Sequence, residues 1–279
     1  MNASVPARAA FGLTVTLLTS CLASLAYSQD ASPWQRDTYS AVRLLAGSRS
    51  GNVLLGGIAI QLAPGWKTYW RMAGDSGVPP RFDFSRSENV ETVTVLWPAP
   101  VKFDDGAGGS SLGYKKQVVL PLRIVAKNND KPVTLRAQIS YAVCDKICIP
   151  VDATSELTFA SVASTEDGNL AAALDTVPKP ANVGDLLPMT VRGIRRDGDK
   201  TVQVDVSAPD AKVVNLFVEG PTPEWALPIP KLVGDSPPGL KRFVFELDGL
   251  PPGAKAEGAA LKLTLVGTDR AYEFNVNLN

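Results

Sequence analysis

Apolar and polar residues alternate along two neighbouring stretches near the middle of the chain. Over residues 135–143 the odd-numbered positions are apolar, and most even-numbered positions are polar. The alternation resumes over residues 149–159, where most odd-numbered positions are again apolar. A period of two is typical of half-buried strands, so the pattern predicts a β-hairpin over residues 134–159.

Cys144 and Cys148 flank the predicted turn of this hairpin, which consists of Asp145, Lys146 and Ile147. An antiparallel pair with this loop places the two cysteines directly opposite each other. Their Cα atoms would be about 4.5 to 5.5 Å apart, which is within the range of a disulfide. Both cysteines are even-numbered, whereas the apolar face is odd-numbered. We therefore expect both to lie on the polar face, away from the core.

The rest of the first half also favours short strands, with almost no helical period. Residues 30–160 therefore predict an all-β domain, a β-sandwich. Pro121 lies inside one of the strands and is expected at an edge or a bulge, because proline cannot donate a ladder hydrogen bond. The other predicted strands of this half are Ser40–Ala46, Val53–Leu62, Glu91–Trp97 and Val118–Val125.

Two segments between these strands are rich in glycine, proline or serine, which predicts turns and loops. The first is residues 63–84, whose aromatic residues Trp66, Tyr69 and Trp70 are expected to pack in the core or the loop. The second is Phe103–Gly113, which has no apolar periodicity.

The pattern changes after the hairpin. Residues 164–180 predict a short helix, capped by Thr165 and ended by Pro178, and then a proline-rich linker with a domain boundary near Asn182. Six further strands separated by turn signals predict a second, smaller β-sandwich. They are Met189–Ile194, Thr201–Ser207, Val213–Val218, Arg242–Leu247, Leu261–Val266 and Tyr272–Leu278. We therefore expect a signal peptide at 1–28, a first β-sandwich with the cysteine pair at 29–162, a helix and linker at 163–182, and a second β-sandwich at 183–279.

Residues 1–28 resemble a secretory signal peptide. A short segment with Arg8 precedes an apolar run from Phe11 to Leu25, and Ala26–Ser28 is a cleavage candidate. The run is too short and too polar for a membrane-spanning helix of about 20 residues. Cys21 also fits a lipoprotein cleavage site loosely, but cleavage near Ser28 is favoured. We expect a periplasmic chain with no transmembrane segment after cleavage.

Composition limits the chemistry. The chain has 28 Lys plus Arg, 28 Asp plus Glu and no histidine. The zero net charge gives no sign of nucleic-acid binding. The absence of histidine excludes Ser-His-Asp and Cys-His catalysis and any histidine metal site. Thiols, carboxylates, amines and hydroxyls remain, and no cofactor is indicated.

Cys144 and Cys148 are the strongest candidates for chemistry. In an oxidising compartment they would pair, and a bridge across so short a loop stabilises little, less than the roughly 3 kcal/mol of a 15-residue loop. An accessible pair at a turn is better suited to thiol-disulfide exchange. Lys146 would favour a thiolate, and Asp145 would oppose it. A structural disulfide in a binding or docking module is the alternative, and two thiolates could also hold Cu(I).

Three stretches resemble a known family. Gly65–Pro80, Leu112–Ile124 and Ile139–Phe159 are similar, in order and context, to parts of the N-terminal periplasmic domain of DsbD, the thiol:disulfide interchange protein, and of relatives such as the copper-tolerance reductase ScsB. The resemblance implies an immunoglobulin-like sandwich whose cysteine pair relays electrons from a membrane partner to periplasmic disulfide-bearing proteins. By this likeness Cys148 attacks or receives the partner's disulfide, and Cys144 resolves it.

The resemblance also implies a cap loop that shields the pair. That loop corresponds to Phe103–Gly113, and the cap residues here are Phe103, Asp104, Asp105 and Tyr114. The chain departs from the family in its narrower cysteine spacing and its Gly/Ser-rich cap tip. It also lacks the transmembrane and thioredoxin domains of DsbD. We therefore expect a separate membrane-embedded electron donor of the DsbD, ScsB or CcdA type.

Overall fold

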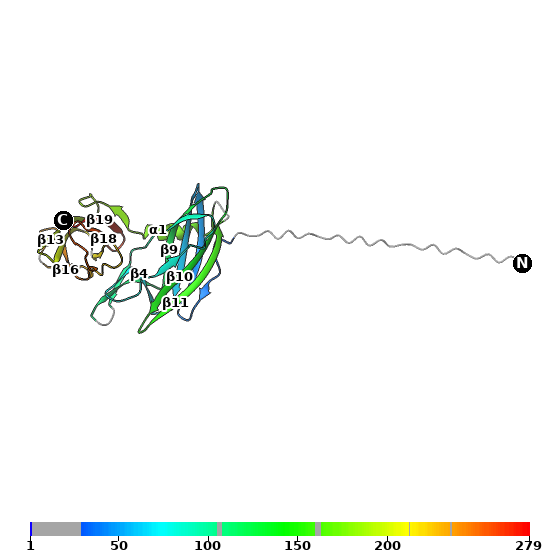
Figure 1. Cartoon of the computed structure of the whole chain (residues 1–279), viewed down its shortest axis with the longest axis horizontal. Coiled ribbons are helices and arrows are strands. Elements are labelled where there is room, and N and C mark those ends of the chain that lie inside the picture. Colours follow the sequence, from blue (N-terminus) through cyan, green and yellow to red (C-terminus); the bar gives the residue numbers. More distant parts are fainter. Residues whose placement is uncertain (2–28, 105–107, 160–162, 212, 235) are drawn as a thin grey trace.

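The structure is a computed structural model that describes residue 1 and residues 29–104, 108–159, 163–211, 213–234 and 236–279. The predicted signal peptide, with Cys21, lies almost entirely outside the described residues. The described chain is nearly all β, as predicted, and it forms two units side by side (Figure 1). The strands of the first unit are β1 (Gln35–Arg36), β2 (Ser40–Ser50), β3 (Val53–Leu62), β4 (Lys67–Gly74), β5 (Arg81–Asp83), β6 (Val90–Val95), β7 (Val101–Asp104), β8 (Ser110–Lys115), β9 (Gln117–Ala126), β10 (Val133–Cys144) and β11 (Cys148–Phe159).

These strands form two sheets. One has the order β1-β2-β3-β9-β6, and the other has the order β11-β10-β4-β8-β7, with β5 pairing with β10. The sheets enclose one core, to which both contribute large apolar side chains. Its fully buried members include Leu44, Ile58, Trp70, Leu112, Leu120, Leu122, Ile124, Leu135, Ile139 and Val143. The sandwich predicted for this half is confirmed.

The hairpin predicted around the cysteines is confirmed in its register. β10 and β11 pair along their whole length, from Val133 with Phe159 to Cys144 with Cys148. The odd-numbered side chains face the core, as the alternation requires. They include Leu135, Ala137, Ile139, Tyr141, Val143, Val151, Leu157 and Phe159.

Two segments expected to be loops contain strands. Residues 63–84 contain β4 and β5, and residues 103–113 contain parts of β7 and β8. β4 is an interior strand between β10 and β8, and its Trp70 is fully buried. The loop prediction was wrong because the glycines mark the ends of the strand. Gly74, for instance, has a φ of 87° at the last residue of β4.

Pro121 was expected at an edge or a bulge, but it lies in an interior strand, opposite Gly57 of β3. Its carbonyl accepts a hydrogen bond from Leu96 N, just past the end of β6. The N and C=O groups of one strand residue point to the same side, so the missing donor faces the place where β6 has ended. No ladder hydrogen bond is lost there.

The predicted helix is α1 (Asp167–Asp175). Thr165 does not cap it, because its side chain donates to Asp30 instead. Glu166 occupies the cap position without a side-chain cap bond. Asp167, in the first turn, accepts from the backbone N of Ser48. The helix thereby docks on the β1-β2-β3-β9-β6 sheet, where Leu170 is fully buried.

The second unit is a smaller pair of four-stranded sheets, with orders β12-β19-β18-β15 and β13-β14-β17-β16. All six strands predicted for it are present. β12 and β16 were missed, and β12 lies inside the segment expected to be a linker. The strands are β12 (Lys179–Ala181), β13 (Thr190–Asp197), β14 (Thr201–Ser207), β15 (Asn215–Glu219), β16 (Lys231–Val233), β17 (Lys241–Glu246), β18 (Ala260–Val266) and β19 (Ala271–Asn277).

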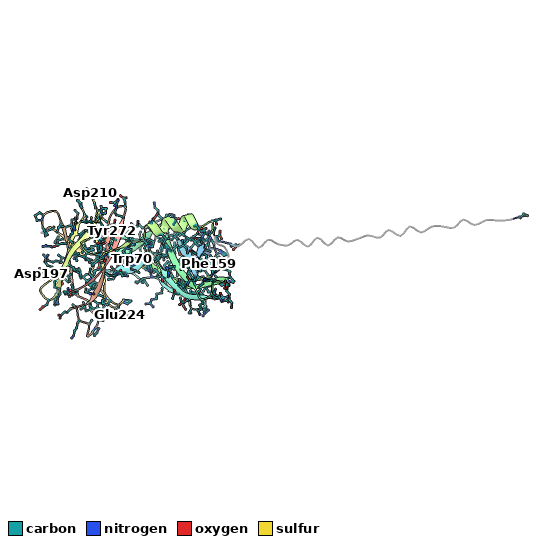
Figure 2. All side chains as sticks on the ribbon, turned by 90° about the horizontal axis from the view of Figure 1, so that it is seen from above. Trp70, Phe159, Asp197, Asp210, Glu224 and Tyr272 are labelled. Carbon is teal, nitrogen blue, oxygen red and sulfur yellow. A yellow bond between two sulfur atoms is a disulfide. The ribbon has the colours of Figure 1, made fainter. Side chains whose placement is uncertain are left out.

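The two units are joined by apolar packing and by an ion-pair network on β4. Trp70 packs against Phe217 of β15, with ring centroids 6.0 Å apart, and it lies between the units in Figure 2. Arg71 donates two hydrogen bonds to one carboxylate oxygen of Glu219 and a third to the other, and it also pairs with Glu273. Burial would lower the pKa of Arg71, but the two glutamates outweigh it and raise that pKa.

Across the described residues, no helix is long and apolar enough to cross a membrane.

Candidate functional site

Cys144 ends β10 and Cys148 begins β11, and the two form a disulfide with Cα atoms 4.2 Å apart. Cys144 also pairs with Lys67 of β4 on its other side. The bridge therefore lies at the end of three adjacent strands. It leaves Asp145, Lys146 and Ile147 as an exposed turn.

The two cysteine residues differ sharply in exposure. Cys148 is exposed, whereas Cys144 is only 2% exposed. The prediction that both cysteines lie on the polar face is therefore wrong for Cys144. Parity places it on the face opposite the main core, but a second small apolar cluster covers it there. That cluster consists of Tyr69, Ala73, Phe103, Ala142 and Cys144.

Tyr69 of β4 reaches both sulfurs. Its hydroxyl donates to Cys144 Sγ at 2.9 Å and lies 3.3 Å from Cys148 Sγ. Gly77 packs on the tyrosine ring so closely that a Cβ there would lie 2.4 Å from Tyr69 Cε1. The hydroxyl is thus held at the bridge and can stabilise negative charge on Cys144 when the bridge opens.

The cover over Cys144 comes from the hairpin of β7 and β8. Phe103 of β7 is buried beside Cys144. Two ammonium groups lie near its ring, that of Lys67 at 4.7 Å and that of Lys115 at 5.5 Å from the centroid. Cation–π contacts of this kind contribute about 0.5–1 kcal/mol at exposed sites. They hold the ring in place. Lys67 also lies opposite Cys144 in the register of β4 and β10, and a neighbouring cation favours a thiolate.

The structure brings only part of the predicted cap together. Phe103 shields Cys144, and Asp104 lies exposed in β7, paired with Ser110. Asp105 lies outside the described residues. Tyr114 is not part of the cover, because it is buried in the main core and its hydroxyl donates to Pro98 O at 2.9 Å. Burial raises its pKa well above the usual value.

Sequence reasoning assigned Tyr69 to a loop and gave Lys67 and Lys115 no role. A signal was present for Tyr69. Adjacent residues of a strand point to opposite faces, so Tyr69 and Trp70 could not both enter the main core. No local pattern indicated a role for Lys67 and Lys115, because the two lysines come together only where β4 pairs with β8.

Removing the ring of Phe103 is expected to open Cys144 to reagents. In a Cys148→Ser background, Phe103→Ala should raise the rate at which iodoacetamide alkylates Cys144 by about tenfold or more, because thiol reactivity follows access. Mass spectrometry at timed intervals gives the rate. In a Cys144→Ser background the same substitution should leave alkylation of the exposed Cys148 within about twofold. Equal acceleration at both cysteines would show general loosening rather than a specific cover.

A hollow of about 480 Å³ borders Cys148. One wall is the segment of Val78, Pro79 and Arg81, and the floor is formed by β10 and β11. Its lining is mostly apolar, and Asp152, which also lines it, accepts a hydrogen bond from Ser140 Oγ at 2.6 Å. The exposed sulfur is therefore next to a surface that can accept an apolar group.

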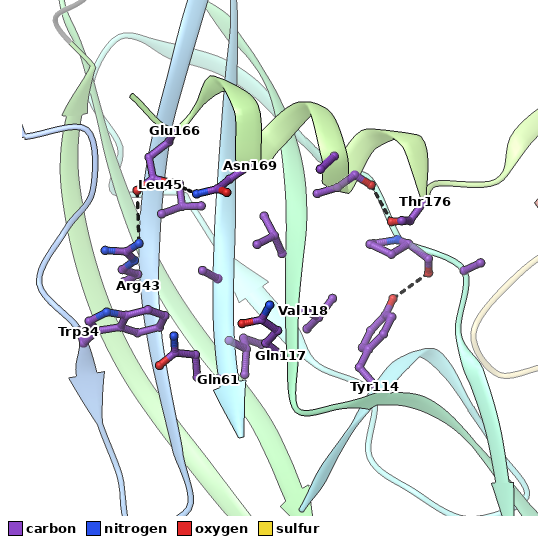
Figure 3. Close-up of a pocket in the computed structure, with 17 residues that line it drawn as sticks. Trp34, Arg43, Leu45, Gln61, Tyr114, Gln117, Val118, Glu166, Asn169 and Thr176 are labelled. Carbon is purple, nitrogen blue, oxygen red and sulfur yellow. Dashed lines mark hydrogen bonds and ion pairs between the residues drawn. The ribbon is translucent and has the colours of Figure 1, made fainter. Parts of the chain in front are cut away.

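A second hollow, of about 540 Å³, lies between α1 and the sheet face of β2, β3 and β9 (Figure 3). Arg43 on its wall stacks on Trp34 at 4.6 Å and pairs with Glu166 at 3.2 Å. Asn169 donates to the same glutamate at 2.7 Å. Arg43 and Asn169 both bind Glu166, although Arg43 Nε is buried without a hydrogen-bond partner among the described residues. Neither cysteine lines the hollow. We interpret it as the seam where the helix docks.

Two comparisons with known proteins give matches. Residues 40–160 match the family model "Thiol:disulfide interchange protein DsbD, N-terminal". A comparison with curated protein sequences gives no match. Among solved structures, the N-terminal periplasmic domain of ScsB from Proteus mirabilis is similar, with a TM-score of 0.72 and 22% identity over 90% of this chain and 99% of that chain. The fold of that ScsB domain is therefore similar to both units of this chain, not to the first unit alone.

The yeast GGA1 GAE domain also matches, with 11% identity over 45% of this chain and 97% of that chain. Its TM-score of 0.27 is too low to support an argument.

Proposed function

Because residues 40–160 form a DsbD N-terminal-like domain, we propose that this chain is a thiol-disulfide relay that passes reducing equivalents through Cys144 and Cys148. The observation that carries the proposal is the asymmetry of the bridge. Cys148 is an exposed residue, whereas Cys144 is buried and its sulfur accepts a hydrogen bond from Tyr69. A disulfide that served only to pin the turn would need neither feature.

The asymmetry supports a defined order of steps. A partner thiolate attacks Cys148 Sγ, the Cys144–Cys148 bond breaks, and a partner–Cys148 disulfide forms. The electron pair of the broken bond stays on Cys144 Sγ, where the Tyr69 hydroxyl stabilises it. A second partner thiol then attacks the mixed disulfide and releases Cys148. The partner pair has lost two electrons and two protons, and the cysteine pair of this chain has gained them.

The outgoing half of the relay uses the same atoms. The Cys148 thiolate attacks one sulfur of a substrate disulfide, the other substrate sulfur leaves as a thiolate, and a mixed disulfide forms. Cys144 then attacks Cys148 Sγ, and the second substrate sulfur leaves. The Cys144–Cys148 bond is restored. The expected donor is a membrane-embedded protein of the DsbD, ScsB or CcdA type, and the expected acceptors are periplasmic disulfide-bearing proteins. The export signal proposed for residues 1–28 agrees with that compartment.

Trapping the mixed disulfide tests the proposal. With Cys144→Ser the resolving thiol is absent, so Cys148 should remain bonded to its partners in periplasmic extracts. These adducts should separate on non-reducing gels, disappear with dithiothreitol, and identify the partner by mass spectrometry. Cys148→Ser is the matched control, because its remaining thiol is buried under Phe103.

Two results would contradict the relay. The first is that Cys144→Ser captures no more protein than Cys148→Ser. The second is a reduction potential below about −300 mV for the wild-type pair, which is typical of structural bridges. Either result would favour a binding module with a structural disulfide. The first result alone would also fit a module that handles copper(I) through the reduced pair.

A further inference from the structure

The outer edge of β11 next to Cys148 has the properties of a docking strand. β11 is the terminal strand of its sheet. In antiparallel pairs, closely spaced Cα atoms of about 4.5 Å mark residues that do not hydrogen-bond to each other. The 4.2 Å separation of Cys144 and Cys148 identifies them as such a pair. The backbone N–H and C=O of Cys148 therefore point away from β10.

The hydrogen bonds of β10 support this assignment. Its even-numbered residues turn their backbone groups away from β11, since Cys144 pairs with Lys67 and Ala142 O accepts from Thr68 Oγ1 at 2.9 Å. By the same register, the backbone N–H and C=O groups of the even-numbered residues of β11 point away from β10, toward the outer edge of the sheet. Cys148, Pro150 and Asp152 thus present carbonyl groups, and Cys148 and Asp152 also present N–H groups. No described residue forms a backbone hydrogen bond with them.

The chemistry requires approach from this side. Displacement at a sulfur proceeds in line, with the incoming sulfur opposite the leaving one. Cys144 Sγ lies inward, toward β4 and under Phe103. The path to Cys148 Sγ therefore comes from beyond the edge of β11, and a segment that lies along that edge would bring its sulfur in line.

Apolar residues flank the same path. The hollow beside Cys148 is lined by Val78, Pro79, Ala142, Pro150 and Val151, among others. Val78 is 55% exposed, and Ile147 of the turn is also exposed. Exposed apolar residues that gather around a hollow are typical of protein-interaction sites.

We propose that partner polypeptides present their reactive cysteine in an extended segment that adds as a strand to the outer edge of β11 at Cys148–Asp152. One apolar side chain near that cysteine enters the hollow beside Val78. The proposal rests on the relay function and adds the mode of recognition, which is main-chain pairing with an apolar anchor. Pro150 removes one donor from this edge and limits pairing to a short stretch, which suits a partner that must leave.

A reaction with model disulfides tests the strand. The reduced chain is mixed with two peptides of equal length, each carrying one cysteine as a mixed disulfide with thionitrobenzoate, and release of the coloured thiolate is followed. One peptide has β-branched residues around the cysteine, and the other has prolines that prevent pairing. Each lost backbone hydrogen bond weakens binding by up to about tenfold, so the β-forming peptide should react about tenfold faster.

Asp152→Pro removes the outward N–H without touching the ladder to β10, and Asp152→Ala is the matched control that keeps it. Asp152→Pro should lower the rate with the β-forming peptide to that of the proline peptide, whereas Asp152→Ala should not. Val78→Asp should slow the β-forming peptide when it carries a leucine near the cysteine. Leu232→Asp, at a residue 57% exposed on the second unit, should have no effect. Leu232→Asp and the wild type should react equally with the small disulfide of thionitrobenzoate itself, and each variant's peptide rates are divided by that variant's own rate with this small disulfide.

The outcomes separate the two proposals. If the small disulfide reacts but the two peptides react equally, or if Asp152→Pro matches Asp152→Ala, strand docking is wrong and the relay stands. If Cys148 reacts with each of these disulfides no faster than free cysteine reacts with it, the relay and strand docking are both wrong.

Discussion

Replacing Tyr69 with phenylalanine should slow reduction of the Cys144–Cys148 bridge by about one to two orders of magnitude. Attack at Cys148 leaves negative charge on Cys144 Sγ, and the Tyr69 hydroxyl is 2.9 Å from that atom. Hydrogen bonds to charged groups contribute about 1.5–3 kcal/mol, and each 1.36 kcal/mol is about tenfold in rate. The ring remains in place, so the cover over Cys144 should persist.

The measurement is the rate of bridge opening by dithiothreitol at fixed pH, quenched with an alkylating reagent and resolved by mass. Tyr114→Phe is the matched control. It removes a buried hydroxyl from the neighbouring strand β8, but that hydroxyl donates to Pro98 O in the main core. A Tyr69→Phe rate within about twofold of wild type, or equal slowing by Tyr114→Phe, would exclude a direct role of the Tyr69 hydroxyl.

The hairpin could be predicted because its determinants are local. A strict alternation and a loop of fixed length determine which residues face the core and which residues oppose each other. The register of Cys144 and Cys148 follows directly. The even numbering of both cysteines also predicted correctly that the pair lies outside the main core.

Burial of Cys144 could not be predicted in the same way. Parity identifies the face of a strand, but not whether another element covers that face. The cover is Phe103, from a hairpin that comes earlier in the chain and is brought there by the pairing of β4 with β8. Its sequence is rich in glycine and serine, which indicated a loop. The family resemblance pointed to the cover, but it also included Tyr114, which the pairing turns into the core.

β4 was missed because its polar residues have partners far away in the sequence. Thr68 is buried and donates to Ala142 O of β10. Arg71 finds its partners in the second unit. Without these contacts the segment has no apolar alternation, so only the tertiary structure shows it to be a central strand. The same strand carries Tyr69, which makes β4 the link between the disulfide and the second unit.

Replacing Arg71 with methionine should lower the free energy of unfolding by about 2–4 kcal/mol. Breaking a fully buried ion pair costs about 3–5 kcal/mol, since the partner charge is left without compensation. Here Glu219 would be left without a cation, and Glu273 would keep only the ammonium group of Lys262 at 3.4 Å. We expect somewhat less than the full cost because the Arg71 side chain is 19% exposed. Urea unfolding followed by circular dichroism measures the change.

Arg136→Met is the matched control for this prediction. Arg136 also bridges two glutamates, Glu88 and Glu156, but its side chain is 36% exposed and theirs are more so. Exposed pairs contribute about 0–1 kcal/mol, so this substitution should cost no more than that. Arg71→Met combined with Glu219→Gln and Glu273→Gln should recover part of the loss, because no carboxylate is then left unpaired. If Arg71→Met and Arg136→Met cost the same, the network on β4 does not hold the two units together.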